Sequence, residues 1–357
     1  MAVRIIHPRP NPIVAAMYTL SDLNVDVIVV HGPAGCCFMA SRMLEEAGVR
    51  VVTSGMKEDD LIFGGTAPLV ETLKLVEERF HPRTVAVVGT CSSMIIGEDM
   101  GAAIRRAGIG CNAFPVDCHG CSGDNTVGAI KALEAACEAG ILPADERDRQ
   151  IRLMTAATDM EKRIGMAGKQ YLSPTRGPTK LSAAKRMLDV LRSGGKVACV
   201  MLAKKELAFR FADMFLALKQ ARDALGGEVY TIANLDPGLG LPRIRGYASA
   251  ILKELEEKGA SPDEIVGGLD EYALVGERMK EKADAYAPDL LVLIGIPHAY
   301  PELPSDGILI TDQPRQLANY LSMGLEAVGE VSSHSMVMGA RSIIPLETGD
   351  TIRELLG

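Results

Sequence analysis

Eight cysteines are the most reactive side chains of this 357-residue chain, and most of them lie in its first third. They are Cys36, Cys37, Cys91, Cys111, Cys118, Cys121, Cys137 and Cys199. Residues 1–7 lack the apolar stretch of a secretion signal, so we expect a cytoplasmic protein without a disulfide framework. Thiolates are soft ligands that suit iron-sulfur clusters or zinc. We therefore expect the chemistry in the first third of the chain.

Two loops present a cysteine close to a glycine, each directly after a run of β-branched residues. Cys36 follows Gly35, and Cys91 lies two residues after Gly89. Glycine next to these thiols favours the close approach of a cofactor, so these four residues are the predicted cofactor-binding set. Cys36 and Cys91 are the predicted metal ligands, and Cys37 is a weaker candidate. The alternative is that these cysteines are buried as small apolar side chains.

A third loop holds a CxxC pair, Cys118 and Cys121. Such a pair indicates half of a zinc site or a redox dithiol. Because the sequence contains no second CxxC, a structural role or a secondary redox role is the favoured interpretation. The pair is therefore a less favoured candidate for metal binding.

Four side chains near these loops are candidates for proton transfer: His31, His119, Glu98 and Asp99. A lone histidine is more often part of a hydrogen-bonded scaffold than a catalyst. The acidic pair is also suited to cap the helix that is expected to start there. The sequence alone leaves both interpretations open.

Alternating β-branched runs and helical stretches must position these loops, and they are typical of parallel sheets buried on both faces. We predict two Rossmann-like α/β domains, at residues 1–145 and 181–357, joined by a connecting segment at residues 146–180. The loops at the carboxyl ends of parallel strands share one edge of a sheet, so the three cysteine loops should meet there. The expected strands are residues 25–30, 49–53, 84–88, 111–116, 196–202, 228–233, 289–295 and 307–311.

Composition and motifs exclude several functions. The net charge of -8 argues against a nucleic-acid partner, and no apolar run approaches the roughly 18 residues that a membrane span needs. The P-loop pattern GxxxxGK[ST] is absent, so we expect no ATP site on this chain.

Several of these segments together resemble a known family. The HGPAGC sequence at residues 31–36, Cys91 after Thr90, and IIGED at residues 95–99 resemble the cluster-binding motifs of the nitrogenase component 1 family. The Asp117-Cys118 segment is similar to a further family segment. Nitrogenase itself has three such domains, and among the smaller members the chain most resembles the catalytic subunits of Ni-sirohydrochlorin a,c-diamide reductive cyclases.

The resemblance implies a catalytic component that reduces a nickel tetrapyrrole and closes a lactam ring in the synthesis of the methanogenesis coenzyme. A separate iron-sulfur ATPase, similar to nitrogenase reductase, would supply single electrons and would alone bind ATP. One alternative is a reductase of another tetrapyrrole, similar to light-independent protochlorophyllide reductase. Another is a non-catalytic scaffold for the assembly of a metallocofactor.

One departure from the family pattern bears on the cluster. Larger members carry a further cluster cysteine upstream, whereas residues 8–17 contain none. Cys36 and Cys91 then give two thiolates per chain, and a homodimer would offer the four that a 4Fe-4S cluster needs. If Cys37 is a third ligand, a dimer would instead hold two clusters.

Overall fold

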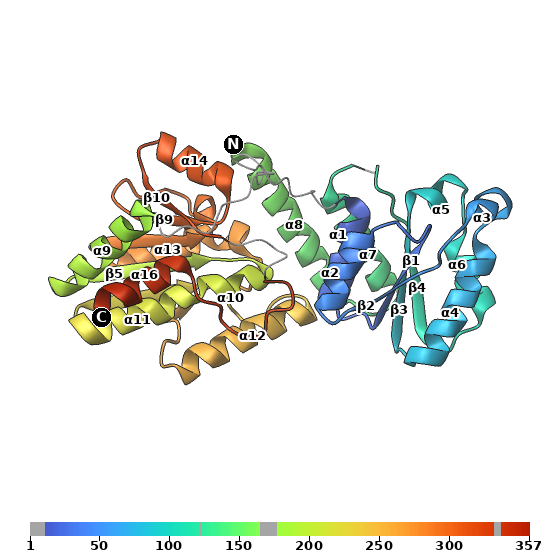
Figure 1. The fold of residues 1–357 in the computed structure, drawn as a ribbon, viewed down its shortest axis with the longest axis horizontal. Helices are drawn as coiled ribbons and strands as arrows, with labels where there is room; N and C mark the ends of the chain where they lie inside the picture. The colour runs from blue at the N-terminus through green and yellow to red at the C-terminus, as the bar shows by residue number, and fades with distance from the viewer. Residues whose placement is uncertain (1–10, 122, 165–176, 332–336) are drawn as a thin grey trace. The chain divides into compact units, whose positions relative to one another are not determined.

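The computed structural model describes residues 11–121, 123–164, 177–331 and 337–357. The chain divides into two compact units, both visible in Figure 1. The N-terminal unit comprises Arg9–Thr155 and Leu241–Arg243, and the C-terminal unit contains Ala156–Gly240 and Ile244–Gly357. The boundary between the two units lies inside helix α8 (Ala144–Ile164). The predicted connecting segment, residues 146–180, therefore contains most of a long helix. Residues 165–176 of that segment lie outside the described residues. Among the described residues, no helix is long and apolar enough to cross a membrane.

The N-terminal unit is built on a four-stranded parallel sheet in the order β2-β1-β3-β4. Its strands are β1 (Val27–His31), β2 (Arg50–Thr53), β3 (Thr84–Gly89) and β4 (Asn112–Val116). Its helices, apart from the first part of α8, are α1 (Pro12–Asp22), α2 (Phe38–Glu46), α3 (Glu58–Phe63), α4 (Thr66–Phe80), α5 (Cys91–Ile95), α6 (Met100–Ala107) and α7 (Asn125–Glu138).

Both faces of this sheet are buried, as its β-branched strands predict. One set of alternating strand residues, including Val29 and Val87, packs against α4 and α6. The opposite face is equally buried and lies under α1 and α7, which pack on each other. Gly128 of α7 lies against the backbone of Pro12, so that any side chain at this position would overlap the carbonyl group of Pro12. Helices α1 and α7 are thus in backbone contact.

The C-terminal unit contains a six-stranded parallel sheet in the order β10-β9-β8-β5-β6-β7. Its strands are β5 (Lys196–Leu202), β6 (Glu228–Ala233), β7 (Glu264–Ile265), β8 (Leu290–Gly295), β9 (Ile308–Thr311) and β10 (Glu326–Gly329). Its helices are α9 (Pro178–Arg192), α10 (Ala208–Phe211), α11 (Asp213–Leu225), α12 (Pro242–Glu257), α13 (Tyr272–Tyr286), α14 (Pro314–Ser322) and α16 (Glu347–Leu356), with 3-10 turns η1 (Lys205–Leu207) and η2 (Pro297–Ala299).

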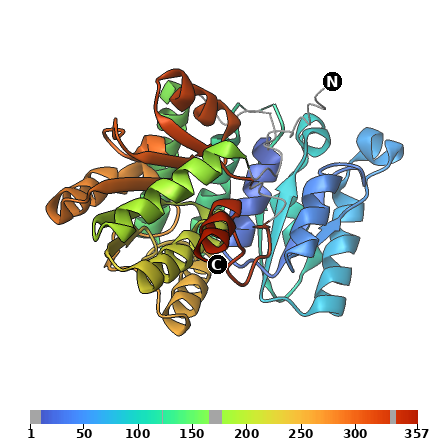
Figure 2. The same cartoon turned by 60° about the vertical axis from the view of Figure 1, so that its left-hand side comes forward.

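Helices cover this second sheet as well. Side chains of α13, such as Val275 and Met279, form one core with Val200, Leu293 and Leu309 of the strands. Helices α9, α11 and α16 pack against one another and against β5, β6 and β10. In Figure 2 the C-terminal helix α16, in red, lies beside α11, in yellow.

The predicted fold class is confirmed: both units are α/β with parallel sheets. The predicted strands at residues 196–202 and 228–233 coincide with β5 and β6, and the others end within two residues of the observed bounds. The sequence did not predict β7, which is two residues long, or the short strand β10. It also did not predict α1, α3, α5 and α8.

Candidate metal centre

The order of strands in the first sheet creates a switch point between β1 and β3. From β1 the chain moves to β2 on one side, and it returns to form β3 on the other side. The connections after β1 and β3 therefore run in opposite directions. This leaves a crevice at the carboxyl ends of the two strands, and ligands of open parallel sheets bind in such crevices. Cys36 lies in the loop after β1, and Cys91 is the first residue of α5 after β3. The topology therefore brings the two predicted ligands to one crevice.

Direct packing holds these two loops together. The hydroxyl group of Thr90 donates a hydrogen bond of 2.9 Å to the carbonyl oxygen of His31. Gly32 lies against the same threonine, and a Cβ atom at this position would overlap the Thr90 side chain. Glycine is required here because the loop after β1 must approach the start of α5 this closely.

Cys36, Cys37 and Cys91 lie close enough for the charge of one thiolate to affect the pKa of another. Burial raises the pKa of the Cys36 thiol, and the negative charge of a Cys91 thiolate raises it further. Burial also raises the pKa of Cys37 to about 11, with additional contributions from Cys36, Cys91 and Cys118. Each thiolate disfavours the others in the absence of a positive charge, and a bound metal ion would relieve this repulsion. By residue type, these thiols are the ligands that iron-sulfur clusters take.

Cys37 has a backbone conformation that is unusual for a residue with a side chain. Its φ angle of 58° lies in the left-handed region, and the residue directly precedes the first turn of α2. This conformation costs roughly 1–2 kcal/mol for an L-residue, and such strain concentrates at functional sites. The strain fits a loop whose shape is fixed by what the neighbouring thiols must hold.

Gly120 is a site residue that sequence reasoning missed. Its backbone N–H donates a hydrogen bond to Sγ of Cys91 at 3.2 Å, and a Cβ atom on Gly120 would lie 3.3 Å from the same sulfur. Hydrogen bonds to ligand sulfurs tune the potential of iron-sulfur clusters. The only sequence signal was a glycine inside the CxxC loop. This loop therefore contacts the site through its backbone.

The other predicted cofactor residues have different surroundings. A Cβ atom on Gly35 would meet no atom within 4 Å, so this glycine borders open space beside Cys36. Gly89 faces Met100, Met94 and the carbonyl oxygen of Cys118, so protein packing alone explains a glycine here. Within the CxxC pair, Cys118 is buried and Cys121 is exposed.

The candidate proton donors are mostly engaged in structural contacts. His31 is fully buried, and its Nδ1 lies 2.9 Å from the Ser54 hydroxyl group, while burial lowers its pKa. Glu98 accepts hydrogen bonds from Gly65 N–H and the Thr66 hydroxyl group at the start of α4. Both carboxyl oxygens of Glu98 are therefore occupied by another helix.

Asp99 and His119 occupy two further positions near the site. Asp99 is the N-cap of α6 and accepts a hydrogen bond of 2.8 Å from the Ala102 N–H. His119 is partly buried in the loop between β4 and α7. Within the described parts of the chain, no group of three or more His, Cys, Asp or Glu residues is arranged to hold a metal ion.

Large apolar side chains are exposed on the helices at this edge of the sheet. Phe38 and Met39 belong to α2, Ile62 and Phe63 to α3, and Ile95 to α5. Phe63 is 85% exposed and Ile95 is 84% exposed. These helices follow β1, β2 and β3, so their first turns lie at the same edge of the sheet as the cysteines. Exposed apolar side chains on helices that start at one edge of a sheet are typical of an interaction surface.

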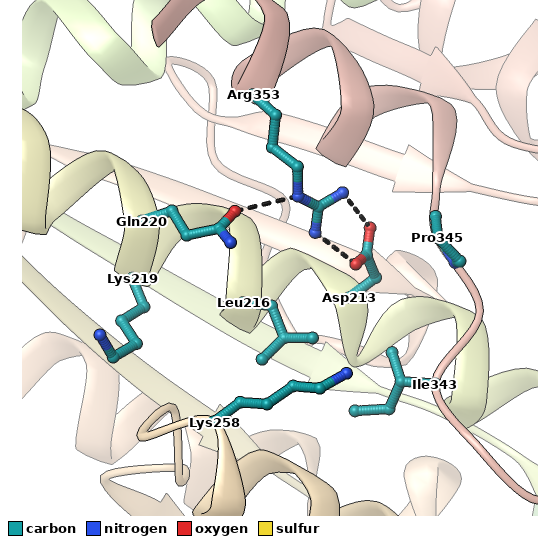
Figure 3. Close-up of a pocket in the computed structure, with 8 residues that line it drawn as sticks. All are labelled: Asp213, Leu216, Lys219, Gln220, Lys258, Ile343, Pro345 and Arg353. Atoms are coloured by element: carbon teal, nitrogen blue, oxygen red, sulfur yellow. Dashed lines mark hydrogen bonds and ion pairs between the residues drawn. The ribbon is translucent and has the colours of Figure 1, made fainter. Parts of the chain in front are cut away.

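The C-terminal unit has a separate pocket of about 380 Å³, shown in Figure 3. It is lined by Asp213, Leu216, Lys219, Gln220, Lys258, Ile343, Pro345 and Arg353. Arg353 is bonded to Asp213 and Gln220, Lys219 pairs with Asp223 on its own helix, and Lys258 pairs with Glu254 of the preceding helix α12. Since these cations are already neutralised, we assign no ligand to this pocket.

Comparisons with known proteins place the chain in a family. The sequence profile of the nitrogenase component 1 type oxidoreductases matches residues 12–206. The Ni-sirohydrochlorin a,c-diamide reductive cyclase complex component CfbD of Methanothermobacter thermautotrophicus is 46% identical over 98% of this chain and 98% of its own length. The component of that name from Methanosarcina acetivorans is 44% identical over 99% of this chain and 98% of its own length. A nitrogenase iron-molybdenum cofactor biosynthesis protein, NifE of Methanococcus maripaludis, is 32% identical over 35% of this chain and 27% of its own length. With this evidence and its two parallel α/β sheets, the chain belongs to the nitrogenase component 1 type oxidoreductases.

Proposed function

We propose that this chain is the catalytic component of an ATP-dependent, nitrogenase-like reductase that reduces and cyclises Ni-sirohydrochlorin a,c-diamide. The observation that carries the proposal is the convergence of Cys36 and Cys91 at one switch point. The full-length relatives named for this reaction supply the substrate. A separate iron-sulfur ATPase would supply the electrons, because this sequence has no P-loop.

Cys36 and Cys91 would hold a 4Fe-4S cluster, which transfers single electrons when it is bound. The chain would contribute the thiolate sulfurs and the Gly120 N–H that donates to Cys91. The open space beside Gly35 would leave room for the inorganic atoms. His31 and His119 stay candidates for proton transfer, and Glu98 and Asp99 would act mainly by fixing the helices they cap.

A second copy of this chain would complete the cluster. Cys36 and Cys91 provide two thiolates, and a two-fold axis through the cluster would place the same pair of the second copy opposite them. The exposed apolar side chains of α2, α3 and α5 flank these cysteines and would be covered in such a dimer. Covering them would favour association through the hydrophobic effect.

Replacing either ligand with alanine tests the assignment. Anaerobically purified Cys36→Ala and Cys91→Ala proteins should lose their iron and the cluster absorption band. Cys199→Ala is the matched control, because Cys199 is fully buried in β5 of the other unit and should leave iron unchanged. Full iron content in both ligand variants would show that the cysteines are structural.

Native mass spectrometry tests how the cluster is shared. A shared cluster requires a dimer with four irons in total. A dimer with eight irons would implicate Cys37 or a ligand other than cysteine. An iron-loaded monomer would contradict sharing altogether.

Turnover separates an enzyme from an assembly scaffold, the alternative that the NifE match favours. The protein would be incubated with an iron-sulfur ATPase, MgATP, a reductant and Ni-sirohydrochlorin a,c-diamide under anaerobic conditions. We expect a product with a new lactam ring, detected by mass spectrometry. A protein that carries iron but forms no product would support the scaffold.

A further inference from the structure

The second sheet has a switch point of the same kind as the first. From β5 the chain moves outward to β6 and β7, and it returns to form β8 on the other side of β5. Ligands of open parallel sheets bind at such switch points, so the crevice beyond the carboxyl ends of β5 and β8 is the expected ligand position of the C-terminal unit. None of the predicted metal ligands or cofactor-binding residues lies there.

Polar side chains, rather than apolar ones, gather at this crevice. Lys204 follows β5, His298 follows β8, and Asp312 and Gln313 follow β9. The Nε2 atom of His298 lies 3.4 Å from a carboxyl oxygen of Glu161, which α8 contributes. The pKa of Lys204 is lowered by burial but raised overall by neighbouring acidic groups, which include Asp312 and Glu161. These contacts and charge interactions connect Lys204, His298, Glu161 and Asp312 into one cluster within one unit, and Gln313 is the next residue after Asp312.

Gln313 is the unusual member of this cluster. It is 4% exposed, and within the described residues neither its amide oxygen nor its amide nitrogen has a hydrogen-bond partner. It lies at the start of α14, directly after β9, both of which are labelled in Figure 1. Burying both atoms without partners is unfavourable, and such groups in native proteins call for a specific explanation. A ligand group that hydrogen-bonds to both atoms provides one.

The hydrogen-bonding capacity of Gln313 restricts the chemistry of that group. A carboxylate only accepts hydrogen bonds and would leave the amide oxygen unpaired, whereas an ammonium group only donates and would leave the nitrogen unpaired. A primary carboxamide has an acceptor and a donor side by side and satisfies both atoms. The carboxyl groups of Asp312, Glu161 and Asp270 outnumber the single cation Lys204, so the cluster disfavours an anionic ligand group.

We infer that the crevice beyond β5 and β8 recognises a primary carboxamide of the substrate, with Gln313 as the residue that pairs with it. The inference rests on the proposed function, since Ni-sirohydrochlorin a,c-diamide carries two such groups where Ni-sirohydrochlorin carries carboxylates. Gln313 would then determine specificity for the amidated substrate.

Binding of these two nickel tetrapyrroles tests the inference. Dissociation constants would be measured anaerobically, by absorbance titration, for the wild-type protein, Gln313→Leu and Gln220→Leu. We expect the wild type to prefer the diamide by at least about 10-fold, and Gln313→Leu to lose this preference. Gln220 is the matched control, because it is an exposed glutamine of the same unit, and its variant should keep the preference.

Stability gives a readout that does not depend on the substrate. Removing two unpartnered polar atoms should leave the midpoint of thermal unfolding of ligand-free Gln313→Leu at or above that of the wild type. A clearly lower midpoint would mean that Gln313 makes structural hydrogen bonds, and it would overturn the inference. A Gln313→Leu protein that still prefers the diamide would overturn it too, with the proposed function intact. A wild type that binds neither tetrapyrrole would instead refute the proposed function.

Discussion

Replacing Glu330 with glutamine should change how the stability of the C-terminal unit depends on pH. Glu330 follows β10 and is fully buried, and the N–H of Thr348 donates to its Oε1 at 2.9 Å. The Nζ atom of Lys180 lies 3.8 Å from Oε2 of Glu330 and 3.6 Å from Oε2 of Glu347. The two carboxyl groups interact directly, and a hydrogen bond between them requires a proton on one of them. Glutamine has nearly the same shape and can donate to Glu347 as a protonated Glu330 does.

The expected magnitude follows from the two pKa values. Burial, with a contribution from the hydrogen bond to Glu347, raises the pKa of Glu330 from 4.5 to about 7. Burial also acts to raise the pKa of Glu347, but its hydrogen bond to Glu330 and the charges of Lys180 and Arg210 lower it to about 2. For Glu330 the difference in pKa between the unfolded and the folded chain corresponds to about 3 kcal/mol of unfolding free energy, at about 1.4 kcal/mol per pKa unit.

The sign differs for the two groups. Stability from Glu330 is fully present below about pH 4.5, where both states are protonated, and it is lost as the pH rises through about 7. Stability from Glu347 is present above about pH 4.5 and is lost as the pH falls towards 2. Of these two groups, only Glu330 therefore contributes a slope between pH 5 and pH 8. Glu330→Gln should match the wild type within about 1 kcal/mol at pH 5 and exceed its stability by about 3 kcal/mol at pH 8.

Urea unfolding of the metal-free protein, followed by tyrosine fluorescence, measures this effect. The chain has no tryptophan, and most of its eight tyrosines belong to the C-terminal unit. Those tyrosines are Tyr230, Tyr247, Tyr272, Tyr286, Tyr300 and Tyr320. Glu256→Gln, at an exposed position of α12, is the control and should follow the wild type at every pH. A constant difference between Glu330→Gln and the wild type from pH 5 to pH 8 would refute the reasoning.

Three further predictions concern the cysteine site. Gly120→Ala places a Cβ atom 3.3 Å from Sγ of Cys91, so the midpoint potential of the cluster should shift or iron should be lost. A spectroscopic redox titration and an iron assay measure both effects. Gly246→Ala, which has open space around its Cβ atom, is the control and should change neither the potential nor the iron content. Ile95→Glu should weaken the dimer without lowering the unfolding temperature, whereas Leu321→Glu, on the other unit, should leave the elution volume in gel filtration unchanged. Calorimetry with MgATP should detect no micromolar site, and finding one would place the energy-coupling step on this chain.

The first sheet shows why part of the site was predictable. In a parallel sheet, chain direction alone places every loop that follows a strand at one edge, so Cys36 and Cys91 were expected to meet. The hydrogen bond from Gly120 to Cys91 was not predictable, because it depends on the path of a loop. Glu98 illustrates the same limit. The sequence left it open whether Glu98 transfers protons or caps the helix that follows it, and in the structure it instead contacts Thr66 at the start of α4, more than thirty residues earlier.

The second sheet was predicted less completely for a different reason. β5 contains seven residues and its central position makes it almost wholly apolar, which gives a strong pattern. β7 has two residues and β10 has four, and both lie at edges of the sheet, where few side chains must be apolar. The polar cluster around Gln313 has no fixed spacing in the sequence, because three of its segments follow different strands and Glu161 lies on helix α8. Only the folded chain brings them together.

The backbone contact between α1 and α7 has a consequence for the order of events during synthesis. Helix α1 begins at Pro12, and its partner α7 begins at Asn125, more than a hundred residues later. At ribosomal speeds of roughly 5–20 residues per second, α1 leaves the ribosome roughly 5–20 seconds before α7 can cover it. During this interval the apolar side chains of α1, which are buried in the finished unit, lack their main partner, although α2 and β3 are already present for part of it. A nascent chain arrested before Gly128 should therefore bind chaperones that recognise apolar segments, and it should release them once α7 has been made.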